Sequence, residues 1–315
     1  MQYPVNEPLI IIVGPTGVGK TQLAFDVACQ LDGEIISADS RLFYRGMDIG
    51  TAKPSLEMQR KIQHHLIDFA EPDEAISLRI FQQKTEQAIE SVHSHGHLPI
   101  MVGGSGQYIR AFIEGWSIPP QKPDERLRTA LSNWADEIGS EEIYQKLKLL
   151  DPAAALKIDH RNVRRTIRAM EVILGTGRSF SDQRLKLGTN YSYKMVGLYL
   201  PRDALFQRID ERVDQMITDG LVAEVEGLMK KGYSEDLPSL SAIGYKEIID
   251  FLEKKISLEE ASRIIKSRTH QFVRRQANWF KQDDERIHWL ESSPLATGEV
   301  VKFIQSKEGW ICKQT

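Results

Sequence analysis

The stretch GPTGVGKT (residues 14–21) is the feature that most constrains what this chain can fold into. It matches the pattern G-x-x-x-x-G-K-[ST] and stands between an apolar run, LIIIV (9–13), and a helical segment, TQLAFDVACQL. Glycines let backbone N–H groups turn towards phosphate oxygens, and the helix N-terminus adds a favourable partial charge. The motif therefore predicts a polyphosphate site in which Lys20 supplies a charge and the Thr21 hydroxyl can hold Mg²⁺. The residues of this phosphate loop are Gly14, Pro15, Thr16, Gly17, Val18, Gly19, Lys20 and Thr21.

Three further apolar runs indicate buried strands: EIISA (34–38), LPIMV (98–102) and MVGLYL (195–200). Short apolar strands separated by helical stretches predict a parallel sheet with helices on both faces, so the expected fold class is α/β. Ligands of such sheets bind at the carboxyl ends of the strands. The phosphate loop, Asp39 and residues 103–106 all follow such ends, so we expect them to face one site.

The middle of the chain has a different pattern. The proline-rich stretch SIPPQKPD (117–124) breaks the alternation, and apolar residues then recur at helical spacing. The dipeptide DP at 151–152 predicts a helix start, and Asp159 is expected to cap a longer helix that ends near Gly175. We therefore expect a helical insertion domain at 118–190, inside a P-loop α/β core made of residues 1–117 and 191–315.

Composition excludes several classes of protein. The formal net charge is −3, so any nucleic-acid site must be a local basic patch. Cys29 and Cys312 are the only cysteines, which excludes a disulfide framework and a cysteine-based zinc site within one chain. The longest early apolar run is too short to span a bilayer, and MQYPVNEP lacks the features of a signal peptide. We expect a cytoplasmic protein that does not contact membranes.

Basic residues gather on one face of each of two expected helices. The stripe on the helix after Asp159 consists of Arg161, Arg164, Arg165 and Arg168. Ser257 and Glu260 predict a capping box for the second helix, in a part of the chain (202–282) with a helical pattern. The stripe on the second helix consists of Arg263, Lys266, His270, Arg274 and Lys281. Each stripe is either an ordinary solvated face or a footprint for a phosphate backbone. Arg268 and Arg275 break the apolar side of the second helix, which is costly unless they meet anions or carboxylates.

Several longer blocks closely resemble the bacterial tRNA dimethylallyltransferases, also called isopentenyl-tRNA transferases. Besides the phosphate loop, the matching blocks are ISADSRLFYRGMDIGTAKP (36–54), HHLID (64–68), GGSGQYIRA (103–111), DHRNVRRTIRAMEV (159–172), RIDERVDQM (208–216), LPSLSAIGYKEI (237–248) and THQFVRRQANWF (269–280). The resemblance covers about residues 9–282 and is specific, because the block after Asp39 is not a general feature of phosphate-loop proteins.

The resemblance implies transfer of a dimethylallyl group from dimethylallyl diphosphate to N6 of adenosine 37, beside the anticodon of tRNA, with release of diphosphate. It implies that Asp39 is the general base, that the phosphate loop and Mg²⁺ hold the donor diphosphate, and that Arg212 contacts this diphosphate, with Arg208 as a second candidate. Other interpretations are a Mg²⁺-linked role for Asp39 and a surface ion pair for Arg212. We expect a monomer.

The resemblance also implies contacts to the tRNA anticodon stem-loop, with the insertion domain gripping the stem. The residues concerned are Asp39, Ser40, Arg41, Leu42, His160, Arg161, Asn162, Val163, Arg164, Ser241, Ala242, Ile243, Gly244, Tyr245, Lys246, Arg274, Arg275, Gln276, Ala277, Asn278, Trp279, Phe280 and Lys281. Ser105 matches a position near the target base where relatives often have threonine, which is a mild departure. His64 and His65 are interpreted as solvated or core residues rather than ligands.

Two alternatives remain open from the residues themselves. A nucleoside or nucleotide kinase shares the nucleotide-binding phosphate loop and an acidic residue after the second strand, and it would bind ATP. A non-catalytic RNA-binding switch that senses a nucleotide would also need the loop, but it would not need Asp39.

Overall fold

The computed structural model describes residues 5, 7–118, 124–183 and 186–312. The chain divides into two compact units, one formed by Met1–Ala111 with Thr189–Thr315 and the other by Phe112–Gly188. Most of the proline-rich break, residues 119–123, lies outside the described residues.

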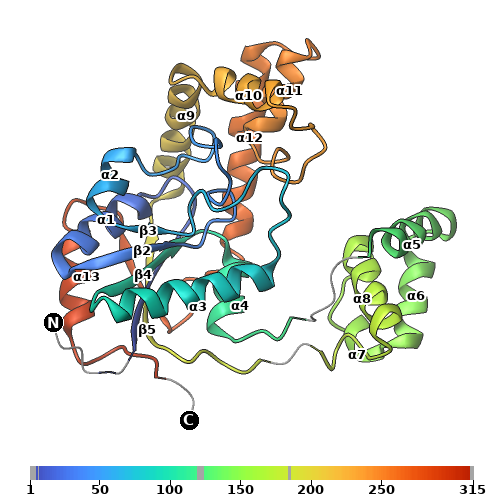
Figure 1. Ribbon diagram of the computed structural model, residues 1–315, viewed down its shortest axis with the longest axis horizontal. Coiled ribbons are helices and arrows are strands. Elements are labelled where there is room, and N and C mark those ends of the chain that lie inside the picture. The colour runs from blue at the N-terminus through green and yellow to red at the C-terminus, as the bar shows by residue number, and fades with distance from the viewer. Residues whose placement is uncertain (1–4, 6, 119–123, 184–185, 313–315) are drawn as a thin grey trace. The chain divides into compact units, whose positions relative to one another are not determined.

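The first unit contains a six-stranded sheet in the order β3-β2-β4-β1-β5-β6, with every neighbouring pair parallel (Figure 1). Its strands are β1 (Pro8–Val13), β2 (Gly33–Ser37), β3 (His64–His65), β4 (Leu98–Gly103), β5 (Ser192–Tyr199) and β6 (Ile287–Glu291). The prediction of an α/β fold built on a parallel sheet is confirmed. The edge strands β3 and β6 do not belong to the apolar runs identified in the sequence, since β3 is only two residues long and β6 follows the last of the matching blocks.

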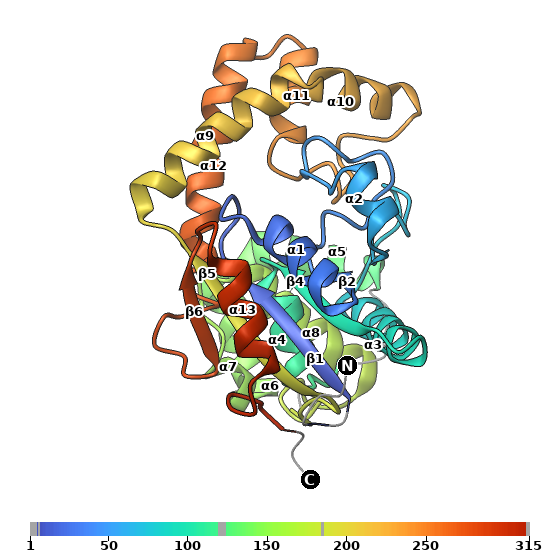
Figure 2. The ribbon, with the colours of Figure 1, turned by 90° about the vertical axis from the view of Figure 1, so that its left-hand side faces the viewer.

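The strand β1 lies inside the sheet and is fully buried. All five residues from Leu9 to Val13 are 0 % exposed, as suits a strand with parallel neighbours on both sides and helices on both faces. Ile10 and Ile12 belong to a cluster that includes side chains of α1 (Lys20–Leu31) and α13 (Ala296–Gln305). On the other side of the sheet lie α3 (Leu78–Ser94) and α4 (Gly106–Ile113) (Figure 2). The alternating faces of the strands therefore bury two separate apolar layers.

A buried lysine joins the sheet to the last helix. Lys194 of β5 is 0 % exposed, and its ammonium donates to the carbonyl oxygens of Phe303 and Ser306 and to the Ser306 hydroxyl. Phe303 and Ser306 belong to the C-terminal end of α13, where carbonyl groups have no partner within the helix. A cation at this end is also favoured by the helix dipole.

Four helices form an extension beyond the carboxyl edge of the sheet (Figure 2): α9 (Arg202–Thr218), α10 (Leu221–Lys230), α11 (Tyr245–Leu252) and α12 (Leu258–Gln276). The basic stripe of α12 is largely committed to acidic partners. Lys266 and His270 lie 2.7 Å and 2.9 Å from carboxylates of α9, and Arg263 pairs with Glu260. For these residues the structure favours an intramolecular role over an RNA footprint.

Two details of α12 differ from the sequence-based prediction. The Ser257 hydroxyl accepts from the Glu260 N–H at 3.1 Å, but the Glu260 side chain binds Arg263, so only half of the expected capping box forms. The helix ends at Gln276, so residues 277–281 lie beyond it. Arg268 forms an ion pair with the buried carboxylate of Glu247, which offsets the expected cost of an arginine on the apolar side of the helix.

The helices of the second unit lie within the range 118–190. This unit contains α5 (Glu125–Ile138), α6 (Ser140–Leu150), α7 (Pro152–Ala155) and α8 (Val163–Thr176) around its own small core. The Asp151 carboxylate caps α7 by accepting from the Ala154 N–H at 2.9 Å, as the DP dipeptide predicts.

The predicted cap of α8 was wrong. Asn162, not Asp159, accepts from the N–H of the third helical residue, because Asp159 instead binds Arg161 in the preceding turn. The helix ends at Thr176, in agreement with the predicted end near Gly175, and Leu174 close to this end is 53 % exposed.

The arginine stripe of α8 is therefore smaller than expected. Arg161 lies outside the helix, and Arg168 pairs with Glu171, whose side chain is fully buried. Arg164 and Arg165 are exposed, and within the described part of the chain neither has a recorded ion pair. In the ranges that the structure describes, no helix is long and apolar enough to cross a membrane.

Candidate active site

The phosphate loop connects the end of β1 to the start of α1. Gly19 precedes the helix with a φ of 103°, and a Cβ there would lie 3.2 Å from the Ser292 hydroxyl and 3.7 Å from the Arg208 guanidinium. Glycine satisfies both the backbone conformation and the close approach. The first N–H groups of α1 have no partners within the helix, so they are available to an anion in front of the loop.

Lys20 is the first residue of α1, and its ammonium donates to the Pro15 carbonyl at 2.8 Å. Burial lowers the pKa of Lys20 to about 8, against an opposing attraction from Asp39, and Arg212 lowers the pKa further. A bound anion would restore the charge that burial disfavours.

Two arginines of α9 face the phosphate loop. Arg208 and Arg212 are four residues apart and so lie on one face of the helix, and both line the same cavity as Lys20. Burial lowers the pKa of Arg212, Asp39 opposes this effect and Arg208 adds to it. Three cationic side chains thus converge beside the loop, which suits a ligand that carries several negative charges.

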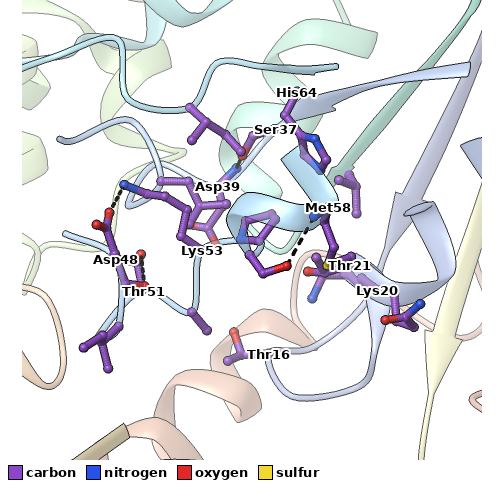
Figure 3. Close-up of a pocket in the computed structure, with 18 of the residues that line it drawn as sticks. Thr16, Lys20, Thr21, Ser37, Asp39, Asp48, Thr51, Lys53, Met58 and His64 are labelled. Carbon is purple, nitrogen blue, oxygen red and sulfur yellow. Dashed lines mark hydrogen bonds and ion pairs between the residues drawn. The ribbon is translucent and has the colours of Figure 1, made fainter. Parts of the chain in front are cut away.

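Asp39 follows β2, at the carboxyl edge of the sheet. Its carboxylate accepts from the Arg41 N–H at 3.0 Å, and its own N–H donates to the Ser37 hydroxyl at 3.3 Å. Both contacts come from the chain beside it, so the turn itself orients the carboxylate. Figure 3 shows Asp39 among side chains from the phosphate loop, from β2 and from the segment that carries Asp48, Thr51 and Lys53.

Two cavities meet at Asp39. The larger, of about 950 Å³, contains the phosphate loop, and the smaller, of about 540 Å³, extends towards α12. The residues that line both cavities are Thr16, Asp39, Thr51, Arg212 and Met216. The carboxylate and one arginine therefore stand where a ligand in the first cavity would meet a ligand in the second.

The segment after Asp39 forms one wall of the larger cavity. Lys53, whose side chain is only 4 % exposed, pairs with Asp48 (Figure 3). It also pairs with Asp68. The Glu224 carboxylate of α10 accepts from three consecutive backbone N–H groups, those of residues 48–50. These contacts hold this wall of the cavity in place. No local sequence pattern predicts the role of Glu224.

Oxygen ligands suited to Mg²⁺ are present in the larger cavity. The Thr21 hydroxyl and the Asp39 carboxylate line the same space as Lys20. Among the described side chains, no group of three or more His, Cys, Asp or Glu residues could hold a metal ion by itself. Mg²⁺ commonly takes one or two protein oxygens, phosphate oxygens and water, so these residues fit an ion shared with a bound diphosphate.

The model of one protein family, described as IPP transferase, matches residues 42–283. The chain belongs to the IPP transferase family. It is 44 % identical over 286 residues to a tRNA dimethylallyltransferase of Thermomicrobium roseum, covering 91 % of this chain and 87 % of the relative. It is 47 % identical over 275 residues to a tRNA dimethylallyltransferase of Roseiflexus sp., covering 87 % and 90 %.

The fold of this chain is also similar to those of solved structures. A full-length tRNA isopentenylpyrophosphate transferase from Bacillus halodurans matches with a TM-score of 0.71 and 38 % identity, covering 95 % of this chain and 96 % of that one. A eukaryotic dimethylallyltransferase, described as acting on tRNA, matches with a TM-score of 0.75 and 28 % identity, covering 92 % and 75 %.

The structure brings many of the residues predicted from the family resemblance to the smaller cavity. Those that line it are Asp39, Ser40, Arg41, Ser105, Ser241, Ala242, Ile243, Gly244, Arg275, Gln276 and Trp279. Leu42 lines the larger cavity instead. The Ser105 hydroxyl accepts from the Ser40 N–H at 3.4 Å, so the loop after β4 contacts the segment that carries Asp39.

Other predicted RNA-contacting side chains have partners within the protein. Tyr245 and Phe280 are buried, and the Tyr245 hydroxyl binds Glu224. Lys246 pairs with Glu235, and the Arg41 guanidinium donates to two backbone carbonyls. Arg274 and Lys281 line a third cavity, and Ala277 and Asn278 are exposed. Residues 160–164 belong to the other unit.

His64 lines the larger cavity, although it was interpreted as a solvated or core residue. One ring nitrogen, Nδ1, lies 2.7 Å from the Ile62 carbonyl, which fixes the proton on that nitrogen. Burial lowers the pKa of His64, which favours the neutral form of the ring. His65 instead binds the Glu34 carboxylate at 2.6 Å.

Proposed function

We propose that this protein transfers a dimethylallyl group from dimethylallyl diphosphate to N6 of adenosine 37 in tRNA, next to the anticodon, and releases diphosphate. The observation that carries the proposal is the meeting of two cavities at Asp39 and Arg212, with Lys20 and Thr21 of the phosphate loop lining only the larger one. A diphosphate donor suits the cationic cavity, and a base extruded from a single-stranded loop suits the other. Membership of the IPP transferase family supports the same reaction.

In the proposed reaction, the N6 amine attacks the allylic carbon of the donor. The new C–N bond forms as the C–O bond to diphosphate breaks, and the amine loses one proton. Asp39, between the cavities, accepts this proton, which compensates for the weak nucleophilicity of an amine conjugated with the ring.

Negative charge builds on the departing diphosphate. The backbone N–H groups of the phosphate loop, Lys20 and Arg212 stabilise that charge, and Arg208 assists from the rim. Mg²⁺ bound through Thr21 would supply further charge neutralisation when present. None of these groups needs to move a proton, so they act by position and charge alone.

The test is a reaction of the purified chain with unmodified tRNA, Mg²⁺ and either dimethylallyl diphosphate or γ-labelled ATP. We expect N6-isopentenyladenosine in the nucleoside mass spectrum only with the prenyl donor, and no product from a tRNA with guanosine at position 37. Transfer of labelled phosphate without prenylation would favour the kinase alternative and overturn the proposal. A hydroxylated prenyl donor, offered in parallel, measures donor selectivity.

Donor binding is expected to weaken as the pH rises through about 8, because the pKa of Lys20 is lowered to about 8 and only its charged form attracts diphosphate. The affinity for the donor should be full below this pKa and should fall about tenfold per pH unit well above it.

The stability of the fold depends on the charge of Lys20 in the opposite sense. The unfolded lysine has a pKa of 10.5 and therefore binds its proton more tightly than the folded one. Lys20 thus lowers the free energy of unfolding below pH 8, and this cost disappears as the pH approaches 10.5.

Titration calorimetry with dimethylallyl diphosphate across this pH range measures the effect. Lys20→Met is the control, because it should bind weakly at every pH and show no step near pH 8. A wild-type affinity that stays flat across this range would contradict the assignment.

A further inference from the structure

We propose that Gln276 is a positioning residue for the diphosphate site rather than an RNA contact. Its side-chain oxygen accepts from the Thr16 N–H at 2.9 Å, and its side-chain nitrogen donates to the Gly104 carbonyl at 3.0 Å. The residue is 4 % exposed and is the last residue of α12. One amide therefore joins the phosphate loop to the loop after β4. The inference rests on the proposed role of the phosphate loop in holding the donor.

The ends of β1 and β4 explain why a side-chain amide is needed at position 276. β1 and β4 pair up to Val13 and Gly103, and the chain then leaves the sheet on both strands. Thr16 and Gly104 lie beyond this last pair, so their backbone groups need partners from elsewhere. A primary amide offers an acceptor and a donor at one point, which an aliphatic or carboxylate side chain does not.

Gly104 is shaped to receive this side chain. A Cβ at Gly104 would lie 2.4 Å from the Gln276 side-chain nitrogen, so any larger residue would displace the amide. The glycine, the buried glutamine and the two hydrogen bonds form one fitted contact. This complementarity distinguishes the contact from that of a surface side chain that folds back by chance.

The Gln276 contact affects both the phosphate loop and the loop after β4. Because the Thr16 N–H donates to Gln276, this group is not free for the donor, and the contact fixes the start of a loop whose later residues Gly17, Gly19, Lys20 and Thr21 line the cavity. On the other side, Gly104 precedes Ser105, whose hydroxyl accepts from the residue after Asp39. Gln276 therefore sets the spacing between the diphosphate and the general base, to which reaction rates are sensitive.

Gln276→Met tests the inference, because methionine has a similar length and volume but makes neither hydrogen bond. The loss of two buried hydrogen bonds is expected to raise the dissociation constant for inorganic pyrophosphate about 10- to 100-fold. The KM for dimethylallyl diphosphate should rise and kcat should fall, while the dissociation constant for tRNA stays unchanged. Gln271→Met, at an exposed position of the same helix, is the matched control and should leave all of these values unchanged.

Gln276→Glu provides a second readout that a purely structural role would not give. The carboxylate can still accept from Thr16, but when ionised it repels the Gly104 carbonyl. A protonated carboxyl can donate to Gly104, so the activity of this variant relative to wild type is expected to rise as the pH falls. This variant also keeps the inference testable if Gln276→Met fails to fold.

The possible outcomes separate this inference from the proposed function. If wild type binds pyrophosphate and Gln276→Met binds it equally well, the positioning role is wrong. Weakened tRNA binding with unchanged pyrophosphate binding would assign the side chain to RNA instead and also overturn the inference. Failure of wild type itself to bind pyrophosphate would refute the donor role of the phosphate loop, and with it both proposals.

Discussion

Asp39→Asn is expected to lower the rate of prenyl transfer by about 10²–10⁴-fold, which is the usual contribution of a general base. Asparagine has nearly the same shape, and its side-chain oxygen can still accept from the Arg41 N–H, as the carboxylate does at 3.0 Å. The turn after β2 should therefore keep its conformation. What is lost is the ability to take a proton from the amine of the target base.

Single-turnover kinetics with saturating donor and tRNA measure this effect without interference from product release. The dissociation constant for tRNA, measured separately, should be close to that of wild type. Asp203→Asn is a suitable control, because Asp203 is an exposed carboxylate of α9 that lines neither of the two cavities. A variant at Asp39 that retains full single-turnover rate would exclude proton transfer to this carboxylate and would revive the nucleotide-sensing alternative.

Arg212→Met is expected to lower kcat by about 10²–10³-fold, as for removal of one preorganised charge-stabilising donor. Arg212 is a cationic side chain that lines both cavities, so in the proposed reaction it would lie beside the bond that breaks between the prenyl group and the diphosphate. Its guanidinium is desolvated enough to lower its pKa, and an interaction in such surroundings is stronger than one at the surface. Methionine retains much of the buried length of the side chain, which limits the structural damage.

The same variant has a second expected result. Arg212 lowers the pKa of Lys20, so removing its charge should raise that pKa and move the alkaline step in donor binding above pH 8. Arg208→Met is the matched control. Arg208 is exposed at the rim and has water to screen it, so its loss should reduce affinity for the donor with a smaller effect on kcat. Equal losses of kcat in the two variants would contradict the proposed position of the reacting bond beside Arg212.

Sequence patterns were most reliable where one local rule determines the structure. The fully buried β1, the phosphate loop and the Asp151 cap all follow from residues within a few positions of one another. Prediction failed where neighbouring groups compete. Asp159 has the right chemistry for a cap, but Arg161 binds it and Asn162 takes its place.

The basic stripe of α12 shows a different limit. Helical periodicity correctly places Lys266 and His270 on one face, but periodicity cannot show what lies opposite that face. The structure places acidic residues of α9 there, 2.7 Å from the Lys266 ammonium and 2.9 Å from the His270 ring, so this face packs against another helix of the protein. The same holds for Arg268, whose unfavourable position on the apolar side is explained only by the buried Glu247.

The sequence by itself determined the α/β class, the phosphate loop and the position of Asp39 after a strand, because strand burial and loop chemistry are encoded in adjacent residues. Only the tertiary structure decided that Arg212 and Asp39 line both cavities and that Gln276 holds two loops together. These contacts join positions up to 260 residues apart in the chain. No local pattern specifies such pairs, because they form only when the sheet and α12 fold together and leave buried backbone groups that need partners.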